Sequence, residues 1–248
     1  SLHIFYIFPI KKDTVLFSSF HGKQYSCNPK YLYEYMIKHG IYKNYVWEFS
    51  DVSKKCLVPN ARVVRSRSLR HTLALLTAEY IITNTECPWY YPKRKKQTLL
   101  QTWHGGGAYK KVGSAVGWGA LENYEQKLNS KKIDYYISSS AKFTEVQSFS
   151  KYVDKKKFIN TGMPRNSVLL VNNHNIRNKV IKDFNFEITD KIIMYAPTYR
   201  GKPKFKNNPV NIPSLDFSKI IQVLHEAFGG TWKVLYRGHY YYQEHTIL

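Results

Sequence analysis

The residues best suited to chemistry in this sequence are a histidine and the three glycines that follow it, at positions 104–107. The apolar stretch Gln97–Trp103 leads directly into His104. A histidine titrates near neutral pH, so its ring can accept the proton of an attacking hydroxyl group. Glycines let the backbone approach a phosphate or a sugar closely, and Lys110 and Lys111 follow them. A lone histidine in a turn is more often structural, but these neighbours favour a general base.

Three more segments place a cationic side chain close to the end of an apolar stretch or a turn. In Gly162–Asn166 a proline turn precedes Arg165, whose planar guanidinium suits a phosphate or a carboxylate. Ala196–Arg200 combines a hydroxyl group with a guanidinium. Arg237–His239 joins a cation to an ionisable ring, a pair suited to holding a pyrophosphate and easing departure of its leaving phosphate. The first segment could also be an arginine on a solvated turn. The other two are common in proteins, so each segment alone is weak evidence of function.

Small polar residues follow two further apolar stretches, in Asn84–Glu86 and Ser138–Ser140. Such residues either cap the next helix or hydrogen-bond to a substrate, and caps are commoner. The segment His21–Gln24 also follows an apolar stretch. It is equally consistent with a structural loop and with a contact to an acceptor.

Strands alternating with helices must position these residues. Short β-prone apolar runs are separated by stretches with helical spacing, which predicts a parallel sheet with its ligands at the carboxyl ends of the strands. The predicted strands are 14–20, 45–49, 61–64, 80–83, 97–103, 134–138, 191–195 and 232–236. The predicted helices run from Pro29 to just before Gly40, over 68–80 and over 217–228. We place a domain boundary after residue 185, and too few residues follow it for a complete nucleotide-binding domain.

The composition indicates a folded protein with an anionic partner. Lys and Arg number 38 against 17 Asp and Glu among 248 residues, and the formal net charge of +21 attracts nucleic acid, anionic membranes or polyphosphates alike. No nucleic-acid-binding motif is recognised, so we expect no nucleic acid. Three scattered cysteines match neither a zinc site nor a disulfide framework and predict a reducing environment. The run Leu2–Ile10 is far shorter than the roughly 20 residues that cross a bilayer.

The order of these motifs along the chain is stronger evidence of function than any one motif. Together they resemble the CDP-glycerol glycerophosphotransferase family, which includes teichoic acid primases and polymerases. The resemblance covers essentially the whole chain and is carried by Phe17–Lys23, Trp103-His104-Gly105 with Lys110 and Gly113, Gly162 with Pro164-Arg165-Asn166, Ala196–Arg200, and Arg237 with His239.

This resemblance implies a GT-B-like α/β fold of two Rossmann-type domains. Residues 1–185 would form the acceptor domain, and residues 186–248 the start of a nucleotide-donor-binding domain that we expect to be incomplete. The implied activity moves glycerol phosphate or ribitol phosphate from CDP-glycerol or CDP-ribitol to a lipid-linked teichoic acid or capsule acceptor and releases CMP. The protein would act peripherally at the cytoplasmic face of the cell membrane, against an anionic surface. Magnesium could assist, although the sequence has no dedicated metal-ligand cluster.

The resemblance also implies roles for individual residues. His104 would be the general base and His239 a second catalytic residue. The residues expected to bind substrate are Trp103, Gly105, Gly106, Lys110, Arg165, Asn166, Thr198, Arg200 and Arg237. One departure is Gly106-Gly107-Ala108, where the family often has threonine, proline and leucine, so the donor or acceptor can differ.

Two other classes of function stay open at this point. A GT-B glycosyltransferase that uses a nucleotide sugar would need the same scaffold. A non-enzymatic basic protein that binds membranes or nucleic acid would account for the positive net charge alone, without the motifs.

Overall fold

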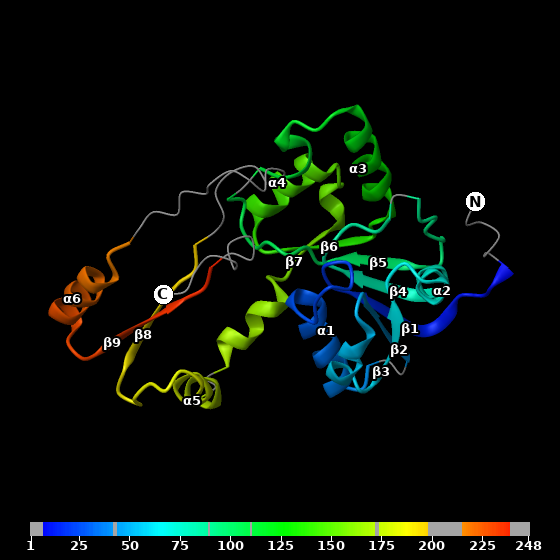
Figure 1. Ribbon diagram of the computed structural model, residues 1–248. Coiled ribbons are helices and arrows are strands. Elements are labelled where there is room, and N and C mark those ends of the chain that lie inside the picture. Colours follow the sequence, from blue (N-terminus) through cyan, green and yellow to red (C-terminus); the bar gives the residue numbers. More distant parts are fainter. Residues whose placement is uncertain are drawn as a thin grey trace. The chain divides into compact units, whose positions relative to one another are not determined.

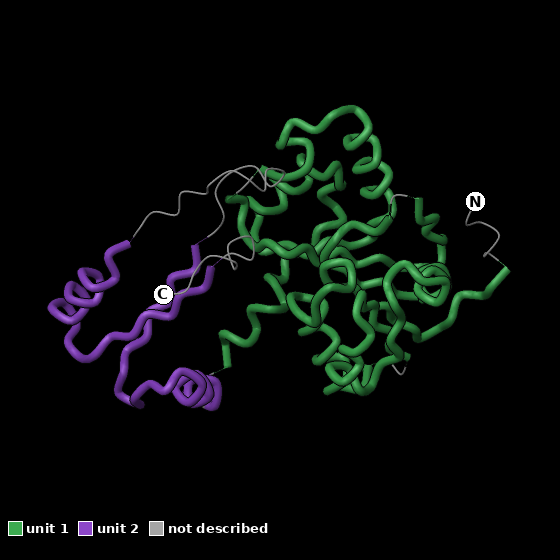
Figure 2. Tube along the Cα trace, viewed as in Figure 1, with its two compact units in different colours: residues 1–171 green, residues 172–248 purple. Residues whose placement is uncertain are grey.

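The structure is a computed structural model that describes residues 7–41, 44–88, 90–109, 111–171, 174–197 and 215–238. The chain divides into two compact units, Ser1–Val171 and Asn172–Leu248 (Figure 2). This division lies before helix α5 (His174–Asp183), whereas the sequence placed a domain boundary after residue 185. The helix belongs to the second unit because the Arg177 guanidinium donates hydrogen bonds to the backbone oxygens of Ile188 and Asp190.

The first unit is built on a sheet of seven parallel strands in the order β3-β2-β1-β4-β5-β6-β7 (Figure 1). All its pairings are parallel, so the carboxyl ends of the strands share one edge. The strands are β1 (Lys11–Ser18), β2 (Asn44–Phe49), β3 (Ala61–Arg65), β4 (Ala78–Thr83), β5 (Thr98–Gln101), β6 (Tyr135–Ser138) and β7 (Phe158–Asn160). A parallel α/β sheet is therefore confirmed as the fold class.

Two hydrophobic cores cover the two faces of this sheet. On the central strand β1, Val15 and Phe17 face one core and Leu16 faces the other, as alternation along a strand requires. Tyr33 of helix α1 (Cys27–Lys38) packs in the first core, and Leu76 of helix α2 (Leu69–Thr77) packs in the second. Burial on both faces explains why the strands are continuous apolar runs.

The remaining described helices of this unit are α3 (Ala120–Lys132) and α4 (Ala141–Lys151), with the short 3₁₀ helices η2 (Val52–Leu57), η3 (Gly113–Val116), η4 (Lys155–Lys157) and η5 (Pro164–Leu170). The Ser140 hydroxyl caps α4 by accepting from the backbone N–H of Phe143. Ser140 is therefore a helix cap, which was one of its two sequence interpretations.

The second unit contains two parallel strands, β8 (Lys191–Tyr195) and β9 (Trp232–Tyr236), and helix α6 (Phe217–Phe228) between them in the sequence. Tyr195 packs against Phe217, and Phe228 against Trp232, with ring centroids 5.7 Å and 6.2 Å apart. These contacts hold the helix against its strands. In the part of the chain that the structure describes, no helix is both long and apolar enough to cross a membrane.

Candidate active site

His104 lies just beyond β5, at the carboxyl edge of the sheet. Its Nδ1 is 2.8 Å from the backbone oxygen of Asn84, which follows the neighbouring strand β4. A carbonyl oxygen can only accept, so Nδ1 carries the hydrogen and Nε2 is the basic nitrogen of the neutral ring. Burial lowers the pKa of His104 below its ordinary value, which keeps the ring neutral and able to accept a proton near pH 7.

Trp103 supports this histidine from within the protein. Its side chain is buried and its ring stacks on that of His104 with centroids 4.2 Å apart. Its φ of 51° lies in the left-handed region, which is strained for a bulky residue. The backbone N–H of Trp103 donates to Oε1 of Gln101 at 2.9 Å, and this bond fixes the sharp turn. The turn aims the histidine out of the sheet edge.

A buried ion pair lies behind Trp103. The Lys151 ammonium is 2.6 Å from Oε1 of Glu86 and 4.4 Å from the Trp103 ring centroid. Lys151 is only 4% exposed, so the carboxylate and the ring together replace its lost hydration. Helix α4 is thereby attached to the loop that carries His104.

Arg165 of η5 reaches the same loop from a distant part of the sequence. Its Nη1 donates to the backbone oxygen of His104 at 2.8 Å and lies 3.4 Å from Sγ of Cys27. The sequence expected Arg165 to bind substrate, and its contacts in this structure hold the loop that carries His104. Asn166, the next residue, donates its backbone N–H to the Met163 oxygen.

A single buried amide connects these elements. The Nδ2 atom of Asn28, in α1, donates to the backbone oxygens of Thr102 at 3.0 Å and Trp103 at 2.9 Å. Its Oδ1 accepts from the backbone N–H of Arg165 at 3.1 Å. Asn28 is fully buried, so these bonds have no competition from water. The first helix, the β5 turn and η5 therefore meet at one side chain.

A cavity of about 380 Å³ opens beside this loop. It is lined by Phe20, Ser26, Cys27, Tyr31, Arg165, Asn166, Val168 and Leu169. The Phe20 ring is 5.5 Å from the His104 ring, centroid to centroid. The cavity thus combines aromatic and aliphatic walls with one guanidinium, next to the proposed base.

The glycine segment is fixed from strand β6. The Ser139 hydroxyl donates to the backbone oxygen of Gly106, and both Gly105 and Gly106 are partly exposed. The structure therefore brings together His104, Trp103, the two glycines and Arg165.

The other predicted site residues either belong to the second unit or lie outside the described residues. Arg237 is exposed at the end of β9 in the second unit, where its backbone N–H donates to the oxygen of Tyr195. Lys110, Thr198, Arg200 and His239 lie outside the described residues. Within the described ranges, no three His, Cys, Asp or Glu side chains gather as they would around a metal ion.

Sequence reasoning missed two residues that hold the site through their side chains, Asn28 and Lys151. A third residue, Asn84, was singled out in the sequence and holds the site through its backbone oxygen. Asn84 carried a signal, since it follows a strand end, but its side chain was considered rather than its carbonyl. Asn28 and Lys151 lie on helices and resemble ordinary helix residues in sequence.

The chain is similar to known proteins over most of its length. The model of the CDP-Glycerol:Poly(glycerophosphate) glycerophosphotransferase family matches residues 2–247. The chain is 30% identical over 240 residues to the teichoic acid poly(glycerol phosphate) polymerase of Staphylococcus epidermidis, covering 93% of this chain and 33% of that protein. It is 31% identical over 245 residues to the teichoic acid glycerol-phosphate transferase of Staphylococcus aureus, covering 92% of this chain and 60% of that protein.

A solved structure of the wall teichoic acid polymerase TagF aligns with a TM-score of 0.80 and 27% identity, over 100% of this chain and 62% of that chain. The fold and its relatives define the class as glycerophosphotransferase-like. The chain belongs to the CDP-Glycerol:Poly(glycerophosphate) glycerophosphotransferase family, which confirms the resemblance that its motifs indicated. It spans about a third to three fifths of the length of these curated relatives.

Proposed function

We propose that this chain contributes the acceptor side of a transferase that moves a glycerol phosphate or ribitol phosphate unit from a CDP-polyol to a polyol phosphate acceptor. The observation that carries the proposal is the fixed ring of His104, whose Nδ1 lies 2.8 Å from the Asn84 oxygen and whose Nε2 is left as the base. A TagF structure soaked with CDPG, which aligns at 28% identity and a TM-score of 0.72, supports the choice of donor.

In the proposed reaction, Nε2 of His104 accepts the proton of the acceptor hydroxyl as its oxygen bonds to the phosphorus that carries the donor's polyol. The bond from that phosphorus to the bridging oxygen of the pyrophosphate breaks, and its electron pair leaves with CMP. Such transfers depend mainly on positioning and on stabilising negative charge. The buried supports of His104 supply the positioning.

The donor side belongs to the second half of the chain in this proposal. Thr198, Arg200, Arg237 and His239 would contact the two phosphates, in the second domain of a GT-B arrangement. Arginine suits this role because its guanidinium matches phosphate oxygens in pairs. His239 would ease the departure of CMP.

The acceptor is lipid-linked in this proposal, and the protein works peripherally at the cytoplasmic face of the membrane. The formal charge of +21 supports this setting, because both anionic lipid and a phosphate polymer attract a basic surface.

The test replaces His104 with alanine and measures CMP release from CDP-glycerol and from CDP-ribitol. We expect release to fall by at least about a hundredfold, the usual contribution of a general base, while circular dichroism stays unchanged. His39→Ala is the matched control, since His39 is an exposed histidine at the end of α1. Near-normal turnover by His104→Ala would contradict the proposal, and UDP release from a nucleotide sugar would favour the glycosyltransferase alternative.

A further inference from the structure

The loop after β1 holds two adjacent residues in a strained conformation. Phe20 and His21 have φ values of 48° and 54°, and Gly22 follows with 76°. Non-glycine residues in this region persist only where surrounding contacts impose it, and such residues concentrate at binding sites. Phe20 packs near the His104 ring, with centroids 5.5 Å apart. This contact does not account for the strained conformation of His21, which needs another explanation.

Contacts from three neighbouring strand ends impose the loop's shape. The backbone N–H of Phe20 donates to Oδ1 of Asn84 at 2.8 Å, and Oγ of Ser66 donates to the oxygen of His21 at 3.3 Å. The backbone N–H of Ser50 donates to the oxygen of Gly22 at 2.8 Å. The loop is therefore rigid and presents His21 in one place.

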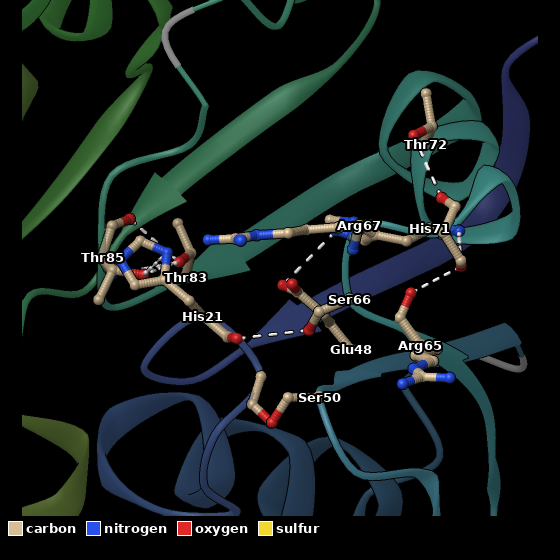
Figure 3. Close-up of polar contacts among 12 residues, drawn as sticks. His21, Glu48, Ser50, Arg65, Ser66, Arg67, His71, Thr72, Thr83 and Thr85 are labelled. Carbon is tan, nitrogen blue, oxygen red and sulfur yellow. Dashed lines mark hydrogen bonds and ion pairs between the residues drawn. The ribbon is translucent and has the colours of Figure 1, made fainter.

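The His21 side chain is exposed but oriented. Its Nδ1 lies 3.4 Å from Oγ1 of Thr85, which is itself buried beside Thr83 (Figure 3). Asn84 and Thr85 are consecutive residues, and they fix His104 and His21 respectively. The two histidines are thus presented at the same edge of the sheet, and His21 has no role in the proposed proton transfer.

Arg67 is held at this edge by a buried relay. Its backbone N–H donates to Nδ1 of His71 at 3.2 Å, and Nε2 of His71 is 3.5 Å from Oε2 of Glu48. Arg67 also has a left-handed φ, of 62°. In Figure 3 its exposed side chain extends from the end of β3 in the direction of His21 and Thr85. The backbone at Arg67 is therefore fixed by a buried histidine ring that is itself held by a carboxylate.

From this geometry we infer that His21 and Arg67 form a subsite for a phosphate diester of the acceptor. The inference rests on the proposed function and specifies what the acceptor must carry: a phosphate group next to its reacting end, with the terminal hydroxyl at His104. The Arg67 guanidinium binds two phosphate oxygens, and the exposed nitrogen of the His21 ring donates to a third.

The surrounding charges favour an anion at this place. The carboxylate of Glu86 is paired with the Lys151 ammonium. It therefore opposes a bound phosphate less than a free carboxylate would.

The experiment measures binding of a synthetic glycerol phosphate trimer to the chain by isothermal titration calorimetry. Measurements are made at physiological ionic strength, where the diffuse attraction of the net charge is screened. We expect Arg67→Gln to weaken trimer binding about tenfold, as loss of a charge-assisted pair should, and Arg67→Lys to restore only part of it. The affinity for CDP-glycerol should not change. The double variant Arg67→Gln with His21→Gln should bind the trimer still more weakly than Arg67→Gln alone.

The control is Arg70→Gln, an exposed arginine three residues away in α2. Equal weakening by Arg70→Gln would mean a diffuse charge effect and would overturn the subsite, as would an unchanged affinity in Arg67→Gln. Unfolding midpoints of all variants establish that the fold is intact.

Turnover separates this inference from the proposed function. If Arg67→Gln weakens trimer binding while the wild type releases no CMP, the subsite stands and the proposed function fails. If His104→Ala abolishes CMP release but Arg67→Gln leaves the acceptor KM unchanged, the function stands and the subsite fails.

Discussion

The backbone oxygen of Asn84 lies 2.8 Å from Nδ1 of His104 and fixes the tautomer of the ring. Catalytic histidines are often oriented by a carboxylate, which would also raise the pKa of the ring. A neutral carbonyl orients the ring with less effect on its basicity. Burial then dominates, and the pKa of His104 falls.

The lowered pKa of His104 predicts how the protein responds to acid. We expect the ring to titrate below its ordinary value of 6.5, because burial disfavours the charged form. The neutral base therefore persists to lower pH than in an exposed histidine, and the stability that its neutral form contributes is present above pH 6.5 and is lost as pH falls through the folded pKa. An NMR titration of the histidine ring protons, assigned with His104→Gln, checks this. Titration at or above 6.5 would contradict it.

Replacing Arg165 tests whether this residue positions His104. The Arg165 charge contributes to lowering the pKa of His104, so Arg165→Gln should raise that pKa in the same titration. Loss of the bond to the His104 oxygen should also reduce kcat about tenfold or more while the donor KM stays constant. A large rise in donor KM with constant kcat would instead identify Arg165 as a donor ligand. Arg70→Gln, an exposed arginine of α2, is a control for the general loss of an arginine.

Removing the Asn28 amide should destabilise the first unit. Asn28→Ala leaves the Thr102 oxygen and the Arg165 N–H without this partner, and each unmet group costs about 1–3 kcal/mol. The Trp103 oxygen keeps only the longer bond from the Thr102 hydroxyl, at 3.3 Å. We expect the free energy of unfolding to fall by about 3 kcal/mol in a urea titration. Asn44→Ala, at an exposed strand start, should change it little. Equal stabilities of the two variants would mean that water replaces the amide.

The buried pair of Lys151 and Glu86 should show strong coupling. Lys151→Met leaves a carboxylate without its cation, which costs about 3–5 kcal/mol for a buried pair and somewhat less here because Glu86 is partly exposed. Adding Glu86→Gln should restore most of the lost stability in a double-mutant cycle. The same cycle on the exposed pair of Lys142 and Glu145 should show little coupling. Additive effects in the buried pair would exclude a direct interaction.

Most of the sheet could be predicted because its strands are buried on both faces. Eight of the nine strands that the structure describes coincide with β-prone apolar runs, and residues 104–107, singled out for chemistry, do follow such a run. Strand β7 (Phe158–Asn160) was missed because three residues carry no periodicity. Helices α3 and α4 were missed because their polar residues give only a weak apolar stripe.

The helix predicted over 68–80 exists but is shorter. It ends at Thr77, and Ala78 begins β4. Its leucines differ in burial, since Leu75 and Leu76 are buried whereas Leu69 is 64% exposed. Helical spacing alone therefore does not show which of these leucines pack against the sheet.

The supports of the site could not be read from the sequence because they join distant segments. The pair Asn28 and Arg165 is separated by 137 positions, and Lys151 and Glu86 by 65. A hydrogen bond between such residues leaves no local signature. Among these segments, only the one that contains His104 lies beside glycines, which is why the sequence could single it out.

The contacts of Asn28 also determine when this site can form during synthesis on the ribosome. Its amide enters the chain early, its acceptors at Thr102 and Trp103 follow later, and the N–H of Arg165 comes last. Until Arg165 has left the ribosome tunnel, the Asn28 side chain has one oxygen without its native donor, and the strained turn at Trp103 lacks its full set of contacts. Because such long-range contacts depend on residues far apart in sequence, the site stays incomplete from the synthesis of Asn28 until Arg165 has emerged.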